Sequence, residues 1–562
     1  MVTNFTARAK NRRSLAQKER WKYGEKLQAA DSAWAEQALR IQDGRQDSLW
    51  QTLKERGYIH QVAGDEKELE RTMIEKRIGV YAGIDPTGPS MHVGHLLPFM
   101  VLLWFYIHGY RAVSLLGGST SRIGDPSGRA DAREEQHSSV RKANMASMHL
   151  QITKIWENME MHARERHGYK REAVWKRALV NNNKWWNKLP VMEFMHYAGS
   201  LARVGPLLSR DTAKRKLQGD AGMSFAELGY PIMQGWDWWE LFKQQDVQVQ
   251  IGGADQFGNL VAGLEVVNSI IPKVIDAKIE PEKFDKNSTR FGVTVPLLTT
   301  SSGEKIGKSA GNAIWLDHDM TPPFELYQYF LKLSDSDAIR FLKLFTLIPL
   351  ERIETIAEDH QKHPEKRLAH HQLAFEVLAM VHGAPCATQV AQEHNALFGQ
   401  KTRFPMPPKD MIGTQYPGDL NVKTNPNATP VNAQSLWSYH ASLPRSLVRD
   451  QTPARILFHA GLVGSRSEGQ RLITAKGAYY GGETGMEKMS ASEQNEMPDE
   501  LKFVVIKNPD VEFSEKMIIG NDTMILRTGR TKVKIIKILE DDEFDRRGLT
   551  APGWDDFKSM RG

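Results

Sequence analysis

Short apolar runs alternate with segments of helical periodicity over the first two thirds of the chain. The run 78–84 precedes the turn-forming residues 85–88, and a helical pattern begins at Met91. Two further runs, 111–118 and 247–253, each end in paired glycines. Strands that alternate with helices predict a parallel α/β sheet. Ligands of such sheets bind beyond the carboxyl ends of the strands, which is where these Gly and Asp residues fall.

The pattern changes twice after residue 320. Residues 323–398 have few glycines and contain long helix-period runs, so we predict a helical domain. Residues 401–432 hold six prolines, which is typical of a linker, and a compact α+β segment follows. We therefore predict five regions: an N-terminal extension (1–60), an α/β domain (61–322), a helical domain (323–400), a Pro-rich linker (401–440) and a C-terminal α+β domain (441–562).

The composition of the 562 residues excludes two classes of protein. The longest apolar stretches, such as 99–107, are far shorter than the ~18–20 residues of a membrane span. The single cysteine, Cys386, excludes an internal disulfide framework and a Cys-rich zinc site. A reducing compartment fits this cysteine content. Cys386 lies in no nucleophile motif, so a bystander role is favoured over a catalytic one.

The net charge of +6 is concentrated at the N-terminus. Residues 1–30 carry eight Lys or Arg against two Glu, so the rest of the chain is balanced. This segment fits a transit remnant, a solvated helix or an arm that contacts nucleic-acid phosphates, and composition does not choose between them. A second basic cluster alternates with apolar residues in a strand-like segment: Arg527, Arg530, Lys532, Lys534 and Lys537.

Two motifs indicate phosphate chemistry. His92 and His95 are three residues apart at a predicted helix start, so both rings lie on one face, and Gly94 lets a flat group approach. A structural or metal-binding pair of histidines is the alternative, although a metal would need a third ligand. Lys305 and Lys308 lie among glycines, which favours a mobile loop that neutralises polyphosphate over a basic surface turn.

His92-Val-Gly-His95 and Lys305-Ile-Gly-Lys-Ser309 resemble the two signatures of class I aminoacyl-tRNA synthetases. The blocks 117–128, 230–237 and 250–256 narrow the resemblance to tyrosyl-tRNA synthetases, and it runs from about 78 to 350. Residues 457–482 resemble an S4-type RNA-binding module. The additions at 1–60 and 154–188 resemble those of filamentous-fungal mitochondrial members, which also promote group I intron splicing. Ile306 and Gly307 depart from the family, where Met and Ser are common.

The resemblance implies a Rossmann-like parallel-sheet catalytic domain, an α-helical anticodon-binding domain and a C-terminal α+β S4-like RNA-binding domain. The tyrosine substrate would be bound by Tyr81, Asp125, Tyr230, Gln234, Asp237 and Gln250. The ATP cleft would be lined by Gly83, Asp85, Thr87, Gly94, Gly253, Asp255 and Gln256. Phosphate charge would be stabilised by His92, His95, Lys305, Lys308, Arg129 and Arg133. RNA contacts are expected from Arg8, Lys10, Arg12, Arg13, Arg527, Arg530, Lys532 and Lys534.

The expected function is tyrosine–tRNA ligase, with a second role as a splicing cofactor for group I introns. The expected partners are tRNA(Tyr), intron RNA, tyrosine, ATP with Mg²⁺ as a substrate complex and a second copy of the chain, with no membrane and no dedicated metal site. Homodimerisation follows from the resemblance, and the apolar segment 96–110 is compatible with it. The expected location is the mitochondrial matrix.

Four alternatives are weighed against this interpretation. One is a single-function synthetase whose arm serves import or solubility. Another is an RNA-binding protein on an inactive synthetase scaffold, which the intact pairs His92/His95 and Lys305/Lys308 disfavour. A small-molecule nucleotidyltransferase would need no RNA-binding tail, and Tyr81 with Asp237 disfavours a tryptophanyl enzyme.

Overall fold

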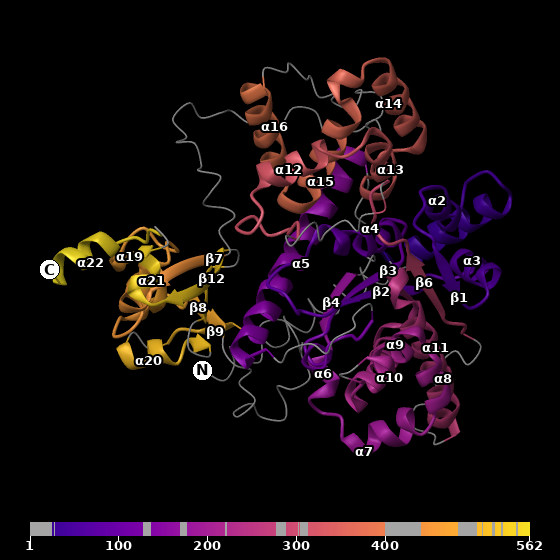
Figure 1. The fold of residues 1–562 in the computed structure, drawn as a ribbon, viewed down its shortest axis with the longest axis horizontal. Coiled ribbons are helices and arrows are strands. Elements are labelled where there is room, and N and C mark those ends of the chain that lie inside the picture. Colours follow the sequence, from indigo (N-terminus) through magenta and orange to yellow (C-terminus); the bar gives the residue numbers. More distant parts are fainter. Residues whose placement is uncertain are drawn as a thin grey trace, which may run out of the picture.

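The computed structural model in Figure 1 describes most of the chain. The described residues are 25–26, 28–127, 136–168, 177–219, 222–276, 288–301, 303, 313–398, 440–481, 503–507, 510–519, 523–529, 532–546 and 549–561. No helix among these ranges is both long enough and apolar enough to cross a membrane.

A six-stranded sheet organises the larger part of the molecule. Its strand order is β1-β6-β5-β2-β3-β4, and only the edge strand β1 runs antiparallel to its neighbour. The bounds are β1 Gln61–Ala63, β2 Gly79–Ile84, β3 Arg111–Leu116, β4 Arg177–Asn181, β5 Val247–Gly253 and β6 Phe291–Val295. The three apolar runs of the sequence are therefore β2, β3 and β5, and the predicted parallel α/β sheet is confirmed.

Apolar helices cover both faces of this sheet, as the continuous apolar runs of its strands require. Side chains alternate along β2, so Val80 and Ala82 join one core while Tyr81 joins the other. The first core includes α4 (Val93–Ile107) and α5 (Ser138–His167), and the second includes α10 (Phe225–Gln245) and α11 (Phe257–Asp276). Shorter elements complete this part: α2 Leu49–Glu55, α3 Glu66–Glu75, α6 Asn183–Trp186, α7 Val191–Phe194, α8 Val204–Ser209 and α9 Asp211–Gln218.

The apolar segment 96–110 belongs to the interior of a single chain. Nearly every residue of α4 from Leu96 to Tyr106 is buried within the first core. From the sequence, the apolar content of this segment was compatible with homodimerisation. In the structure, that apolar content is explained by burial against the sheet. An interface between two copies must therefore use other residues.

Five helices form the predicted helical part, seen at the top of Figure 1. They are α12 Pro323–Leu331, α13 Asp335–Phe345, α14 Leu350–Lys362, α15 Leu368–His382 and α16 Ala384–Phe398. The 30-residue helix α5 reaches from the sheet to α15, where the Asn158 amide donates to the Val381 carbonyl at 2.8 Å. Because α12 to α15 share the first core with α4, the helices and the sheet pack as one body.

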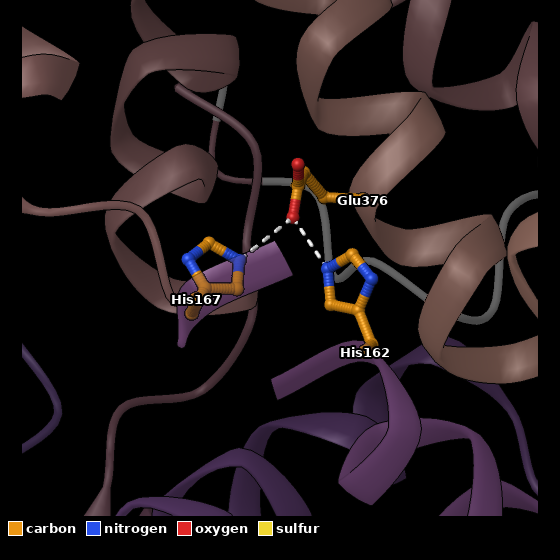
Figure 2. Close-up of side chains that lie close together, drawn as sticks. All are labelled: His162, His167 and Glu376. Carbon is orange, nitrogen blue, oxygen red and sulfur yellow. Dashed lines mark hydrogen bonds and ion pairs between the residues drawn. The ribbon is translucent and has the colours of Figure 1, made fainter. Parts of the chain in front are cut away.

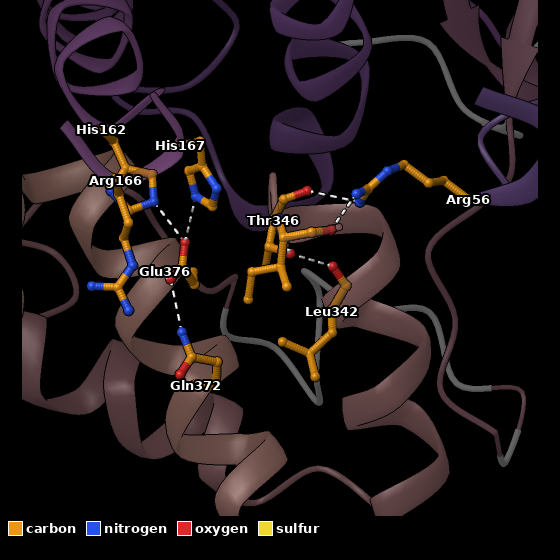
Figure 3. A network of polar contacts seen from close by, with 9 residues as sticks. Arg56, His162, Arg166, His167, Leu342, Thr346, Gln372 and Glu376 are labelled. Atoms are coloured by element: carbon orange, nitrogen blue, oxygen red, sulfur yellow. Dashed lines mark hydrogen bonds and ion pairs between the residues drawn. The ribbon is translucent and has the colours of Figure 1, made fainter. Parts of the chain in front are cut away.

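Arg56 connects the region before β1 to the helical part. Its guanidinium is buried, lies 4.4 Å from the centre of the Trp104 ring and donates to three carbonyls where α13 ends. These acceptors are the carbonyls of Lys343, at 2.9 Å, of Thr346, at 3.0 Å, and of Ile348. Figure 3 shows Arg56 beside Thr346. Carbonyls at a helix C-terminus receive no hydrogen bond from within the helix. Arg56 donates to them, and its positive charge is favourable at this end of the helix.

We expect Arg56→Met to lower the free energy of unfolding by about 2–3 kcal/mol, because it leaves these carbonyls buried without donors. The midpoint of urea unfolding measures this, and Arg71→Met is the control, since Arg71 forms an exposed pair with Glu68. An Arg56 variant as stable as the Arg71 variant would contradict the prediction.

The N-terminal helix packs against the larger α/β part of the molecule through Trp34 and Asp31. Residues 28–42 are helical, and the Trp34 indole donates to the Ile74 carbonyl at 3.2 Å. The Trp34 ring meets the Tyr110 ring edge-on at 4.8 Å, and Asp31 pairs with Arg77 at 2.6 Å. The predicted extension is therefore attached to the body by specific contacts from residue 31 onward.

The C-terminal part has a sheet of its own, with the path β7-β12-β11-β8-β9. Its strands are β7 His440–Pro444, β8 Ala478–Gly481, β9 Phe503–Val505, β10 Ile518–Ile519, β11 Thr523–Thr528 and β12 Lys532–Leu539. Its helices are α18 Pro453–His459, α19 Arg466–Thr474, α20 Val511–Glu515, α21 Asp541–Arg546 and α22 Trp554–Arg561. One apolar core packs α18 to α20 on this sheet and a second packs α21 and α22, which agrees with the predicted α+β class.

Candidate active site

The predicted site residues gather at the carboxyl edge of the main sheet. In the sheet, β2 lies between β3 and β5. The chain continues from β2 to β3 on one side and reaches β5, on the other side, only later. Strand connections diverge at this point, which opens a crevice beyond the strand ends in sheets of this type. Asp85 follows β2, Asn182 follows β4, and Asp255 and Gln256 follow β5. Gly83 and Gly253 are the last glycines of β2 and β5.

A buried carboxylate forms the deepest part of this edge. Asp237, on α10, accepts hydrogen bonds from the Trp185 and Trp186 indoles, each at 2.7 Å, and from the Asn182 amide at 3.0 Å. Burial raises the pKa of Asp237 to about 7, although these three donors oppose the shift. The carboxylate is thus oriented by donors on one side.

Tyr81 and Gln250 approach the same region from paired positions of β2 and β5. Tyr81 is 1% exposed, and burial followed by the nearby Asp237 charge raises its pKa well above the usual value. Among the described residues, neither the Tyr81 hydroxyl nor the Gln250 side-chain oxygen has a hydrogen-bond partner. Buried polar atoms of this kind are costly, so the arrangement indicates a place for a polar ligand group.

Two further carboxylates, Asp85 and Asp125, lie at the same edge of the sheet. Asp85 accepts from the Thr120 hydroxyl and from the Tyr230 hydroxyl, each at 2.8 Å. Asp125 accepts from the Gln256 amide at 2.5 Å and from the Asn259 amide at 3.2 Å. The two carboxylates give this part of the crevice negative charge, which suits a cationic group of a ligand. Thr87 follows Asp85 in a tight turn, in which the Thr87 N–H donates to the Asp85 carbonyl at 2.7 Å.

His92 and His95 form the start of α4 and stack at a centroid distance of 3.7 Å. The His92 Nδ1 accepts from the Gly94 N–H, and the His95 Nδ1 accepts from the His92 N–H, both at 3.1 Å. Since both Nδ1 atoms accept, the neutral rings carry their protons on Nε2. Two N–H donors and the positive helix end would favour an anion, so the phosphate role expected from the sequence stays a prediction.

Several predicted residues lie outside the described ranges: Arg8, Lys10, Arg12, Arg13, Arg129, Arg133, Lys305, Lys308 and Arg530. The chain just after the lysine motif is described, however. Leu316 donates its N–H to the Met91 carbonyl at 2.8 Å, and Val93 donates to the Ile314 carbonyl at 3.1 Å. The described residues that follow the lysine motif, 314–316, therefore lie directly beside the start of α4 and its two histidines.

The comparisons with known proteins agree with this geometry. Residues 73–399 match the model of class I tRNA synthetases (W and Y), and residues 431–556 match the tyrosyl-tRNA synthetase C-terminal domain. The mitochondrial tyrosine–tRNA ligase of Podospora anserina is 40% identical over 95% of this chain and 81% of its own length. The chain belongs to the class I tyrosyl-tRNA synthetases. It is an aminoacyl-tRNA synthetase of the tyrosine–tRNA ligase type.

Solved structures of fungal tyrosyl-tRNA synthetases share the fold. A C-terminally truncated mitochondrial enzyme of Aspergillus nidulans has 47% identity and a TM-score of 0.61, over 66% of this chain and all of that one. The corresponding enzyme of Coccidioides posadasii has 43% identity and a TM-score of 0.60, over 66% of this chain and 99% of that one. The predicted resemblance to the fungal mitochondrial form is confirmed.

Sequence reasoning missed several residues that shape this tyrosyl-tRNA synthetase site. Asn182, Trp185 and Trp186 hold Asp237, and Asn259 holds Asp125. The run of three asparagines and two tryptophans at 181–186, immediately after a strand, was the available signal. Polar residues at the carboxyl end of a strand indicate a binding site as the Gly and Asp clusters do, because ligands of such sheets bind there.

The basic residues of the C-terminal sheet differ in their surroundings. The Arg527 guanidinium lies between the Tyr479 and Phe503 rings, 4.2 and 4.3 Å from their centres. Lys532 and Lys534 lie on β12, the neighbouring strand. Because two rings already pack on Arg527, that side chain serves the packing of the sheet as well as any contact with RNA.

We expect the affinity for tyrosine to rise as the pH increases through about 7, because Asp237 then becomes a carboxylate, a stronger acceptor. The folded pKa lies above the ordinary value, so this group stabilises the fold least above pH 7 and more as the pH falls toward that ordinary value. Indole fluorescence titration across neutral pH measures the affinity. The Asp237→Asn variant should lose this step, and an unchanged pH profile in that variant would contradict the prediction.

Proposed function

We propose that this chain activates tyrosine with ATP and transfers the tyrosyl group to tRNA(Tyr) through the residues described above. A tyrosine carboxylate oxygen attacks the α-phosphorus of ATP, and the bond to the pyrophosphate oxygen breaks. The products are tyrosyl-adenylate and pyrophosphate. A ribose hydroxyl at the tRNA 3′ end then attacks the acyl carbon, and AMP departs. No protein nucleophile is needed, so catalysis consists of positioning and charge stabilisation.

The observation that carries this proposal is the buried polar group around Asp237. Asp237 is held by three N–H donors, and the unpartnered hydroxyl of Tyr81 belongs to the same region. A phenol hydroxyl donates to the Asp237 carboxylate and accepts from Tyr81. Phenylalanine would leave both groups buried without partners, which disfavours its binding. Tyrosine is therefore the amino acid that this pocket suits.

The remaining polar groups of tyrosine are assigned to the other carboxylates at this edge of the sheet. The α-ammonium group would contact Asp125, with Tyr230 and Gln234 beside it. Asp125 is positioned by Gln256 and Asn259, and Tyr230 is positioned by Asp85. This arrangement supports a fixed orientation in which the tyrosine carboxylate is directed toward the nucleotide.

The nucleotide is assigned to the crevice between the β2 and β5 ends. Gly83, Asp85 and Thr87 would line it from one side, and Gly253, Asp255 and Gln256 from the other, with Gly94 below. His92 and His95 would donate to the phosphates, together with Lys305, Lys308, Arg129 and Arg133. Mg²⁺ would arrive with ATP as part of the substrate.

Tyrosine-dependent ATP–pyrophosphate exchange tests the first half-reaction, and charging of tRNA(Tyr) tests the second. We expect both activities. A folded chain that catalyses neither reaction would support an RNA-binding protein on an inactive scaffold. Exchange that depends on tryptophan would overturn the assignment of the pocket.

We also propose that the enzyme is a homodimer whose interface lies in residues 191–225. Seven of the thirteen large apolar side chains that are exposed in the described part of the chain fall within this stretch. Met192 is 74% exposed and Phe225 is 79% exposed. Apolar groups gathered this densely at a surface mark an interaction site. Phe225 begins α10, the helix that carries Tyr230 and Asp237, so the interface would adjoin the tyrosine pocket.

We expect Phe225→Asp to convert the dimer into a monomer, because the carboxylate would be desolvated in the interface. Light scattering coupled to size-exclusion chromatography measures the mass. Leu39→Asp is the matched control, since Leu39 is also exposed, at 56%, but lies outside the stretch. A wild-type monomer, or a Phe225 variant that remains dimeric, would contradict the proposed interface.

A second role in splicing group I introns is proposed for the basic additions. The supporting observation is that residues 28–42 are held on the body through Trp34 and Asp31. The basic residues Arg8, Lys10, Arg12 and Arg13 precede this anchored helix. Broad phosphate contacts, together with those of the C-terminal basic strands, suit the folding of a large RNA.

Splicing of a mitochondrial group I intron by the full chain and by a chain lacking residues 1–47 tests this role, with tyrosylation as the folding control. Loss of splicing with tyrosylation intact would support an RNA-folding arm. If neither protein binds the intron better than an unrelated RNA, the enzyme is a single-function synthetase and its arm serves import or solubility. We propose a mitochondrial location, since the relatives from Podospora and Saccharomyces are named mitochondrial enzymes.

A further inference from the structure

Two clusters of histidines and a carboxylate lie in the helical part, away from the active site. Figure 2 shows the first, in which Glu376 of α15 faces His162 and His167 of α5. The His162 Nε2 lies 2.6 Å and the His167 Nε2 lies 3.4 Å from one Glu376 oxygen. The other oxygen accepts from Arg166 at 2.6 Å and from Gln372 at 2.8 Å (Figure 3). This carboxylate is fully satisfied by protein groups and paired in charge with Arg166, so it needs no ion.

The second cluster joins three consecutive helices. Asp335 is the first residue of α13, His360 lies in the last turn of α14, and His370 lies in the first turn of α15. The His360 Nε2 is 3.1 Å and the His370 Nε2 is 3.7 Å from the same Asp335 oxygen. All three atoms lie within 4.8 Å of one another, and the two rings meet edge-on with centroids 5.3 Å apart.

His360 differs from the histidines of the first cluster in having no hydrogen bond. It is 2% exposed, and neither of its ring nitrogens has a hydrogen-bond partner among the described residues. The Asp335 oxygen is within hydrogen-bond distance of the Nε2 atom, but it lies off the axis of the N–H bond, so no hydrogen bond forms. The His370 Nδ1 is likewise buried and unpartnered. Buried nitrogens in this state are rare and require an explanation, and binding of a metal ion by these side chains is one.

We propose that Asp335, His360 and His370 form a binding site for a divalent transition-metal ion of the Zn²⁺ class. Zn²⁺ binds imidazole nitrogens and carboxylate oxygens at about 2.0–2.2 Å, which places neighbouring ligand atoms of a tetrahedron about 3.4 Å apart. The measured separations of 3.1 and 3.7 Å bracket this spacing. Ligands around an ion direct their lone pairs at a common point, which accounts for an oxygen near the His360 nitrogen but off its axis.

The surroundings define the strength of the site. The Asp335 side chain is 65% exposed, so the ion has access from solvent and water completes its coordination. The His370 Nε2 must give up its hydrogen bond to the Leu333 carbonyl, 2.9 Å away. Arg367 donates to the same carbonyl at 3.3 Å, and its charge opposes a cation. Burial lowers the pKa of His370, although its hydrogen bond to the Leu333 carbonyl opposes the shift.

These features predict weak to moderate metal binding. The lost hydrogen bond of His370 and the charge of Arg367 both disfavour the ion, and the Nδ1 atoms lack the acceptors that usually support metal-bound histidines. The bound ion would tie α14 to the starts of α13 and α15. This site is separate from the proposed Mg²⁺–ATP substrate, and it departs from the sequence-based expectation of no protein metal site.

Binding of Zn²⁺ to the full chain, purified without a histidine tag, tests the proposal by isothermal titration calorimetry. Co²⁺ serves as a second probe, because visible absorption bands report four-coordinate geometry. We expect one Zn²⁺ site per chain that Asp335→Asn or His360→Gln weakens by roughly a hundredfold or more, as loss of a direct ligand should exceed the effect of an outer-shell change. Asp335 is exposed, so its variant keeps the test valid if the His360 variant fails to fold.

Two matched variants separate this site from other histidines. His363→Gln removes an exposed histidine at the same helix end, whose side chain is 54% exposed, and should leave affinity unchanged. His167→Gln removes a member of the satisfied first cluster and should also leave it unchanged. The proposal is overturned if the wild type binds no Zn²⁺, if the Asp335 variant binds as the wild type does, or if either control variant loses the site. Circular dichroism confirms that each variant is folded.

Discussion

Asp237→Asn is expected to reduce kcat/KM for tyrosine by on the order of a few hundredfold while changing that for phenylalanine little. A hydrogen bond to a charged group contributes about 1.5–3 kcal/mol, and a phenol hydroxyl buried without its acceptor costs more. Asparagine keeps the size of the side chain and one acceptor for the Trp185 and Trp186 indoles. It presents an N–H where the phenol needs an acceptor, so tyrosine loses its advantage.

Pyrophosphate exchange with each amino acid measures this ratio. Glu240→Gln is the matched control, because it makes the same carboxylate-to-amide change one turn along α10, where Glu240 pairs with Lys243 at 2.9 Å. The control should keep the wild-type preference. A preference for tyrosine that survives in the Asp237 variant would remove this residue from the specificity site.

His92→Asn is expected to lower kcat for adenylate formation by about 10²–10³, with little change in the KM for tyrosine. Removal of one preorganised donor to transition-state charge typically has an effect of that size. Asparagine is a favourable N-cap, so it replaces the acceptor that His92 offers to the Gly94 N–H and preserves the helix start. What the variant lacks is the Nε2–H donor that we propose contacts the phosphates.

Single-turnover formation of tyrosyl-adenylate measures this step without contribution from tRNA. His108→Asn is the control, since His108 ends the same helix, where its Nδ1 lies 2.8 Å from the Trp104 carbonyl. The control variant should form adenylate at the wild-type rate. If the His92 variant also does so, the histidine pair has a structural role only.

Local patterns were enough to predict most of the catalytic fold. The runs that became β2, β3 and β5 are apolar and end in turn-forming residues, because buried parallel strands need apolar side chains on both faces. The start of α4 could be predicted because anion-binding helix ends have short-range signatures. The helix-period runs after residue 323 became α12, α13 and α15. They could be predicted because the residues on the buried face of a helix recur at helical spacing.

Contacts between distant segments were beyond such reasoning. Asn182, Trp185 and Trp186 meet Asp237 from more than fifty positions away, and their spacing along the chain carries no signal of this. The segment 96–110 has the composition of an interface, yet α4 is buried in its own chain, while the exposed apolar residues lie at 191–225. Composition reports how apolar a segment is but not what covers it.

The sequence by itself thus determined the class of fold, the strand ends that carry the candidate site and the motifs proposed to bind phosphate, because each depends on residues adjacent in the chain. Only the tertiary structure decided which side chains complete the tyrosine pocket, which apolar surface stays exposed, and that Asp335, His360 and His370 converge. Those features depend on how helices and strands pack, and packing brings together groups whose separation along the chain is arbitrary.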